Sequence, residues 1–218
     1  MKFTVAPSIL AADFACLIKE IEKIHKIPNS QVHLDIMDGH FVPNISIGPC
    51  VVKSLRKTTN LPFDVHLMID NPENFFSQFK DAGANYITFH IEQTRNPISL
   101  INKIKELGIK PGISIKPLTN LDAIEHLLPQ IDVLLIMSVE PGFSGQKFIN
   151  SSLTKIEKLR KIKESKNLNF QISVDGGINN KTAEAAVKAG ADILVMGNYF
   201  FKNPFELVKL EIEKLREK

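Results

Sequence analysis

The chain has 218 residues, of which 44% are hydrophobic and 23% charged, and its formal net charge is +3 at pH 7. This composition is ordinary for a soluble globular protein, and the length suffices for one large domain over residues 1–218. Because the positive charge is spread over predicted helices, without a compact basic patch among aromatic residues, we do not expect nucleic acid as a partner.

Short apolar runs alternate with longer amphipathic segments along the whole chain. The apolar runs predict strands over residues 3–9, 32–37, 63–68, 86–90, 110–115, 133–138, 170–174 and 193–196. The segments between them predict helices over residues 13–26, 49–57, 72–82, 97–107, 121–127, 151–165, 181–189 and 204–216.

Residues that start and stop helices agree with this alternation. Asn-Pro pairs at 71–72, 96–97 and 203–204 each offer a capping side chain followed by proline at the first helical position. Gly83, Gly108 and Gly190 stand where helices are expected to end in a left-handed cap.

Repeated strand–helix units with strands that are apolar on both faces predict an α/β protein, a single (β/α)8 TIM barrel. The alternative is a doubly wound open sheet. That fold carries a glycine-rich turn after its first strand, and residues 7–13 (PSILAAD) contain no glycine. We therefore expect the barrel.

Metal-ligand side chains fall near the ends of three predicted strands. His33 and Asp35 share one face of the second strand because residues i and i+2 point the same way, His66 lies on the third, and Asp175 closes the seventh. A single histidine on a strand is more often an ordinary core residue. Buried carboxylates are costly without a counter-charge, however, and barrels place active sites at the C-terminal ends of strands. We predict a divalent metal site formed by all four residues.

Three methionines accompany these residues. Met37 and Met68 lie two positions beyond Asp35 and His66, and Met137 lies on the sixth predicted strand. They predict a hydrophobic lid that keeps water from a reactive intermediate, although methionine is also common core filler. His90 completes no better ligand set and is expected to be structural or adjacent to substrate.

Glycine-containing loops follow the last three predicted strands, at residues 140–146, 176–177 and 197–198. Glycine lets the backbone approach an oxyanion closely, and successive amides form a concave nest for phosphate. Barrels often bind phosphate after strands seven and eight. Because no lysine or arginine is evidently dedicated to the anion, backbone amides are expected to hold it.

A metal, two carboxylates and a phosphate together indicate one reaction class. A divalent ion stabilises an enediolate, while one carboxylate removes a proton beside a carbonyl and the other returns one. Asp35 and Asp175 come from strands far apart around the barrel and are expected on opposite faces of a bound sugar. This arrangement predicts epimerisation rather than hydrolysis.

Two other functions fit less well. A decarboxylase of the orotidylate type needs a lysine beside the second-strand carboxylates, and Leu34, Ile36 and Met37 stand there instead. A non-catalytic phosphosugar-binding barrel is expected to have lost a ligand or an acid/base residue, and all are present.

The sequence resembles the ribulose-phosphate 3-epimerase family over almost its whole length. The matching stretches are residues 6–14 (APSILAADF), 33–44 (HLDIMDGHFVPN), 64–68 (DVHLM), 141–146 (PGFSGQ) and 174–178 (VDGGI). The resemblance implies a barrel enzyme that interconverts D-ribulose 5-phosphate and D-xylulose 5-phosphate in the pentose phosphate pathway. It also implies a homo-oligomer.

The family pattern assigns roles to the matching residues. It implies one divalent ion on His33, Asp35, His66 and Asp175, with Asp35 as proton acceptor and Asp175 as proton donor. Zinc or ferrous iron is expected, with manganese or cobalt also possible, and the shell expansion needed to admit substrate slightly favours iron, cobalt or manganese over zinc. The residues implied to contact substrate or its phosphate are Ser8, His66, Gly142, Phe143, Ser144, Gly145, Gly176, Gly177, Gly197 and Asn198.

Four positions depart from the usual family pattern: Glu140 replaces asparagine, Ser144 glycine, Asn198 serine, and Lys116 the asparagine of an Asn-Pro pair. The first two resemble the related allulose-6-phosphate 3-epimerases, so a hexulose 6-phosphate is the alternative substrate. We expect Glu140 to point away from the phosphate. A strained backbone is expected at Ser144 if its position requires a positive φ.

The two cysteines, Cys16 and Cys50, lack the spacing of a disulfide framework, which favours a reducing, cytoplasmic location. Residues 1–3 lead directly into a predicted strand without an apolar signal segment. The apolar run 133–137 is much shorter than the roughly 20 residues that a membrane span needs. No membrane partner is expected.

Overall fold

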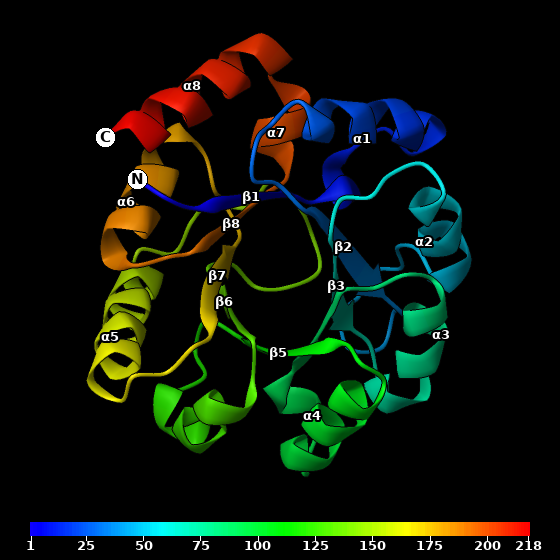
Figure 1. Ribbon diagram of the computed structural model, residues 1–218, viewed down its shortest axis with the longest axis vertical. Coiled ribbons are helices and arrows are strands. Elements are labelled where there is room, and N and C mark those ends of the chain that lie inside the picture. The colour runs from blue at the N-terminus through cyan, green and yellow to red at the C-terminus, as the bar shows by residue number, and fades with distance from the viewer.

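The structure is a computed structural model that describes residues 1–218. Eight parallel strands form one sheet in the order β1-β8-β7-β6-β5-β4-β3-β2. The strands are β1 (Thr4–Pro7), β2 (Val32–Met37), β3 (Phe63–Met68), β4 (Tyr86–His90), β5 (Lys110–Ile115), β6 (Val133–Met137), β7 (Gln171–Asp175) and β8 (Ile193–Met196). Parallel bridges from Val5 to Ser30 and from Ser8 to His33 join the two ends of this order, which closes the barrel and confirms the predicted fold (Figure 1).

Helices surround the strands on the outside of the barrel (Figure 1). The α-helices are α1 (Leu17–His25), α2 (Pro49–Arg56), α3 (Phe76–Asp81), α4 (Pro97–Glu106), α5 (Ser151–Ser165), α6 (Asn180–Ala189), α7 (Asn198–Lys202) and α8 (Phe205–Glu217). The short 3₁₀ helices are η1 (Ile9–Ala11), η2 (Phe14–Cys16), η3 (Pro72–Asn74), η4 (Ile91–Gln93), η5 (Leu121–Ala123) and η6 (Glu125–Gln130). None of the helices has the length and apolar character needed to cross a membrane.

Several predicted helices differ from those observed. The helix expected at 121–127 is two 3₁₀ helices, η5 and η6, and Pro129 inside η6 lacks the amide proton that a continuing α-helix requires. The helix expected from residue 72 begins as η3 and becomes α-helical at Phe76. Asn96 caps α4 as predicted by accepting a hydrogen bond from Ser99, but Asn71 adopts φ 48° and makes no capping bond.

Two apolar clusters stabilise the barrel, one between the sheet and the helices and one inside the sheet. The larger one, with 49 buried residues, includes the outward-facing strand residues and the inner faces of the helices. The smaller one includes Ala6, Leu135, Met137, Ile193 and Val195, which lie on β1, β6 and β8 and face the barrel axis. The axial positions of β2, β3 and β4 carry mostly polar side chains instead, with Met37 and Met68 at the ends of β2 and β3. The interior therefore has an apolar side and a polar side.

Gly112 on β5 pairs directly with Thr88 on β4, and the Cβ of an alanine at position 112 would lie 2.2 Å from the Thr88 hydroxyl. We expect Gly112→Ala to lower the free energy of unfolding by about 1–3 kcal/mol, because overpacking displaces neighbouring atoms. Urea unfolding followed by circular dichroism measures the change. Adding Thr88→Ala should recover part of the loss. Gly48→Ala, where the added Cβ meets no atom within 4 Å, should cost less. Equal losses at both glycines would contradict this account.

Candidate active site

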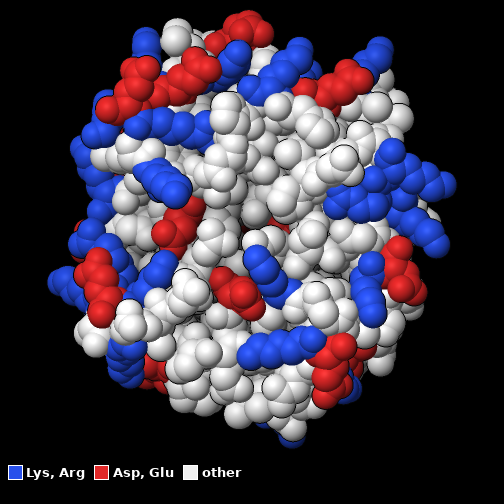
Figure 2. Space-filling view, viewed as in Figure 1, with Lys and Arg blue, Asp and Glu red and all other residues white.

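A pocket of about 570 Å³ opens beside the C-terminal ends of the strands. Every residue that the sequence assigned to catalysis, substrate or lid lines it, except for the two histidines His33 and His66, which are completely buried behind its wall. On the face of the molecule drawn in Figure 2, uncharged side chains make up most of the centre, while lysine and arginine gather mainly toward the periphery.

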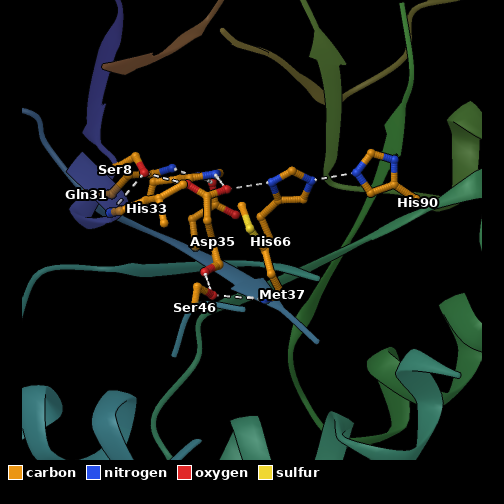
Figure 3. A network of polar contacts seen from close by, with 10 residues as sticks. Ser8, Gln31, His33, Asp35, Met37, Ser46, His66 and His90 are labelled. Carbon is orange, nitrogen blue, oxygen red and sulfur yellow. Dashed lines mark hydrogen bonds and ion pairs between the residues drawn. The ribbon is translucent and has the colours of Figure 1, made fainter. Parts of the chain in front are cut away.

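The structure brings together the four side chains predicted to bind a metal. His33 and Asp35 come from β2, His66 from β3 and Asp175 from β7, and one ligand atom from each lies within 4.8 Å of the others. His33 Nε2 is 3.2 Å and His66 Nδ1 is 2.9 Å from the same oxygen, Oδ1 of Asp35 (Figure 3). The Ser8 hydroxyl donates to the other oxygen, Oδ2.

Strand register explains why these groups meet. Asp35 pairs with His66, and His33 pairs with Asp64, across the β2–β3 ladder. Since alternate residues of a strand face the same side, all four side chains point toward the barrel axis. Alternation along each strand and the parallel pairing of β2 with β3 are therefore enough to bring His33, Asp35 and His66 together.

Asp64 is a functional candidate that the sequence analysis missed. Its Oδ2 lies 2.9 Å from His33 Nδ1 and also accepts a hydrogen bond from the Gln31 side chain. A proton on His33 Nδ1 directed to Asp64 leaves Nε2 of the neutral ring free to bind a metal ion. The signal was available, because Asp64 precedes His66 by two residues and shares its face.

The donor set fits a divalent transition metal. Two imidazoles and two carboxylates converge, three of the four residues are buried, and no lysine or arginine belongs to the cluster. Mixed nitrogen and oxygen ligands of this kind suit zinc, ferrous iron and related ions. A cation at this point would also relieve the contact of two imidazole nitrogens with one carboxylate oxygen.

The two aspartates differ in their affinity for a proton. Burial opposes the ionisation of Asp35, but His33 and His66 outweigh it and hold the pKa of Asp35 well below its usual value. Withdrawal of Asp175 from bulk water, together with the charge of Asp35, raises the pKa of Asp175 to about 6. Burial lowers the pKa of His33, yet Asp35 and Asp64 raise it overall to well above 6.5.

His90, at the end of β4, contacts the cluster from its other side. Its Nε2 lies 2.9 Å from Nε2 of His66, and its Nδ1 lies 3.2 Å from Oε2 of Glu92. Burial lowers the pKa of His90 to about 4. Burial works against the ionisation of Glu92, yet hydrogen bonds from His90, Thr119 and the Lys116 amide lower its pKa to about 2. Glu92 was not singled out in the sequence.

The three methionines line the pocket but belong to two packing groups. Met37 and Met68 form a small cluster with Val42, against which Leu10 and Phe41 pack. Met137 belongs to the apolar cluster inside the barrel. All three reach the pocket wall, and their role as a lid stays a prediction.

The loops after β6, β7 and β8 meet at one side of the pocket. Gly177 has φ +63°, and a Cβ there would lie 2.4 Å from the Phe148 amide nitrogen. Gly145 has φ +82°, and a Cβ there would lie 2.5 Å from Nδ2 of Asn198. Ser144 does not have a positive φ, so the condition under which strain was expected there is not met. Lys147 and Lys202 also line this pocket, and the role of the backbone amides in holding an anion stays a prediction.

Known proteins resemble the chain in sequence and in fold. The Ribulose-phosphate 3 epimerase family matches residues 4–201. The ribulose-phosphate 3-epimerase of Methanocaldococcus jannaschii is 46% identical over 98% of this chain and 89% of its own length. That of Bacillus subtilis is 46% identical over 89% and 90%, and that of Buchnera aphidicola 42% identical over 100% and 95%. A solved tryptophan synthase α-subunit of Pyrococcus furiosus, 14% identical, superposes with a TM-score of 0.72 over 99% of this chain and 98% of its own, which shows a common fold.

The unequal aspartates can be tested by carboxyl titration. In chelator-treated protein carrying ¹³C-labelled aspartate, we expect Asp175 to titrate near pH 6 while Asp35 stays ionised. Asp35→Asn should lower the pKa of Asp175, because it removes the negative charge beside it. Between about pH 4 and 6 the folded carboxyl keeps a proton that the unfolded one loses, so its contribution to stability falls as the pH rises. The signal is assigned by its loss in Asp175→Asn. An unchanged Asp175 titration in Asp35→Asn would contradict the charge coupling.

Proposed function

The chain belongs to the ribulose-phosphate 3-epimerase family, and we propose that it interconverts D-ribulose 5-phosphate and D-xylulose 5-phosphate at carbon 3. One observation carries the proposal: Asp35 and Asp175, two carboxyls with opposite shifts in pKa, reach one pocket from β2 and β7. Inversion at a carbon beside a carbonyl needs one group to accept a proton and another to donate one from the opposite face.

The ionised Asp35 acts as the proton acceptor. Its carboxylate breaks the C3–H bond and takes the proton, while the bonding electrons pass into the enediolate. The protonated Asp175 then donates its proton to the other face of carbon 3, which completes the inversion. In the reverse direction the two residues exchange roles. The Ser8 hydroxyl bond to Oδ2 orients Asp35, which supports its role as acceptor.

His33, Asp35, His66 and Asp175 would hold one divalent ion. When bound, the ion supplies Lewis-acid stabilisation of the negative charge that develops on the sugar oxygens. Zinc or ferrous iron suits this donor set, with manganese or cobalt as further candidates. His33 and His66 also keep Asp35 ionised, and His66 is a proposed substrate contact together with Ser8.

The phosphate is proposed to bind at the loops after β6, β7 and β8. The residues proposed to surround it are Gly142, Phe143, Ser144, Gly145, Gly176, Gly177, Gly197 and Asn198. Lys147 and Lys202 line the same pocket and add positive charge for a dianion. Met37, Met68 and Met137 are proposed to exclude water from the reacting carbon, as an apolar wall does.

We further propose that residues 1–218 act as one catalytic domain of a homo-oligomer in the cytoplasm, within the pentose phosphate pathway. Both cysteines are free, which suits a reducing compartment. A hexulose 6-phosphate is the second candidate substrate, because Glu140 and Ser144 both line the pocket and both depart from the usual family pattern.

The decisive experiment offers metal-loaded protein ribulose 5-phosphate and allulose 6-phosphate in parallel in deuterated water. We expect faster product formation, with deuterium at carbon 3, from the pentulose. A chelator should abolish both signals, and a divalent ion should restore them. Preference for the hexulose would establish the second candidate. Full activity after complete metal removal would refute the metal-dependent reaction, and no exchange with either sugar would refute the epimerase.

The acid/base pair is tested by Asp35→Asn and Asp175→Asn, which keep the side-chain shape but remove the proton-transfer group. We expect turnover to fall at least 100-fold in each variant, in line with the usual contribution of a positioned acid or base. Because both residues are also proposed ligands, metal content is measured for each sample and rates are compared at equal occupancy. Near-normal turnover in either variant would contradict the two-carboxylate mechanism.

A further inference from the structure

A continuous row of polar groups runs from Asp35 through His66 and His90 to Glu92 (Figure 3 labels the first three). Its three contacts are Asp35 Oδ1 to His66 Nδ1 at 2.9 Å, His66 Nε2 to His90 Nε2 at 2.9 Å, and His90 Nδ1 to Glu92 Oε2 at 3.2 Å. Both imidazoles are fully buried, so water does not complete their hydrogen bonding.

Counting protons along the row shows that it needs either a third proton on an imidazole or a cation at His66 Nδ1. Three contacts link two ionised carboxylates through two imidazoles, and each contact needs one positive partner, a proton or a cation, between its two lone pairs. Two neutral imidazoles supply only two protons. If the Nδ1 of His66 binds a metal ion instead of a proton, the remaining two protons satisfy the remaining two contacts: His66 Nε2–H donates to His90, and His90 Nδ1–H donates to Glu92.

We propose that His90 and Glu92 are positioning residues, which hold His66 in the tautomer and ring orientation that present its Nδ1 to the metal. This inference rests on the proposed metal site. His90 acts by accepting the Nε2 proton of His66, and Glu92 acts by accepting the Nδ1 proton of His90. Neither residue touches the metal or the reacting carbon.

Glu92 is itself held by the segment that follows β5. Its other oxygen, Oε1, accepts hydrogen bonds from the Lys116 amide at 2.8 Å and from the Thr119 hydroxyl. Lys155 from α5 binds the carbonyl oxygens of Pro117 and Thr119, each at 2.6 Å. The carboxylate is therefore fixed by backbone, and its Oε2 is left for His90.

Packing fixes the His90 ring as well. The Phe41 ring lies 4.6 Å from the His90 ring, and the Lys116 ammonium lies 4.2 Å from the centre of the Phe41 ring. His33 is supported in the same way but without an intervening imidazole, because its Nδ1 contacts Asp64 directly. Each histidine of the cluster thus has a carboxylate behind it, one in direct contact and one through a second imidazole. Such outer partners of metal-binding histidines are known to tune metal affinity.

The test compares metal affinities of full-length variants by competition with a chromophoric chelator, using zinc and cobalt. His90→Phe keeps an aromatic ring but cannot accept a proton, so we expect about 10- to 100-fold weaker binding. His90→Gln carries an acceptor oxygen near the position of Nε2 and should recover much of the loss. Glu92→Gln has only one acceptor oxygen for two sets of donors and should weaken binding. His40→Gln, on an exposed loop residue, is the matched control and should bind as the unaltered protein does.

A second readout is independent of affinity. In the zinc-loaded protein, ¹⁵N–¹H correlation spectra should show His66 protonated at Nε2 and His90 protonated at Nδ1. Wild-type affinity in His90→Phe, equal losses in His90→Phe and His90→Gln, or the opposite His66 tautomer would each overturn the inference. Failure of the unaltered protein to bind metal would instead overturn the proposed metal site. The unfolding midpoint is measured for every variant. If His90→Phe does not fold, Glu92→Gln and the spectra of the unaltered protein still test the inference.

Discussion

The protein contains an ionised carboxylate, Asp35, inside a closed barrel, and the polar half of the interior is arranged around it. An isolated carboxylate at such a place costs several kcal/mol, because it loses its hydration. Two imidazoles approach its Oδ1 and a hydroxyl donates to its Oδ2. Those imidazoles are buried in turn and need partners for their outer nitrogens. His33 finds its partner in Asp64. His66 finds its partner in His90, which in turn contacts Glu92, and Glu92 accepts a hydrogen bond from the backbone amide of Lys116 after β5.

This outward chain of partners explains why polar side chains occupy β2, β3 and β4 while apolar ones face the axis from β1, β6 and β8. Asp175 is an acidic residue on β7, paired with Met137 of β6 and Val195 of β8. Asp35 has three hydrogen-bond partners, whereas burial and the surrounding charges govern the proton on Asp175. Two identical side chains thus differ in proton affinity because imidazoles offset the burial of Asp35, whereas burial and the charge of Asp35 both act against the ionisation of Asp175.

The sequence predicted what depends on local periodicity. The strands over 32–37, 63–68, 86–90, 110–115 and 193–196 agree with those observed, since apolar runs bounded by turn residues need no distant information. His33 and Asp35 were found because alternation places both on one face of β2, and His66 and Asp175 were found from their positions on β3 and at the end of β7. Register was harder: Asp64 lies opposite His33 only once β2 and β3 are aligned. Lys147 and Lys202 reach the pocket through loop and helix geometry that no spacing rule contains, and the helix expected at 121–127 is instead two 3₁₀ helices, η5 and η6.

The strand residues and the loop residues of the site are separated along the chain. His33, Asp35, His66 and Asp175 all belong to strands, where two neighbours and a packed outer core fix the backbone. Glu140, Ser144 and Lys116 belong to the segments after β5 and β6, and Asn198 begins α7 after β8. Every departure from the usual family pattern thus lies beyond the end of a strand. Loop residues can change which sugar phosphate fits without moving the groups proposed to transfer the proton. Lys116 links the two parts, since its amide secures Glu92 and its ammonium lies over Phe41, so a change in that loop also reaches the support of His66.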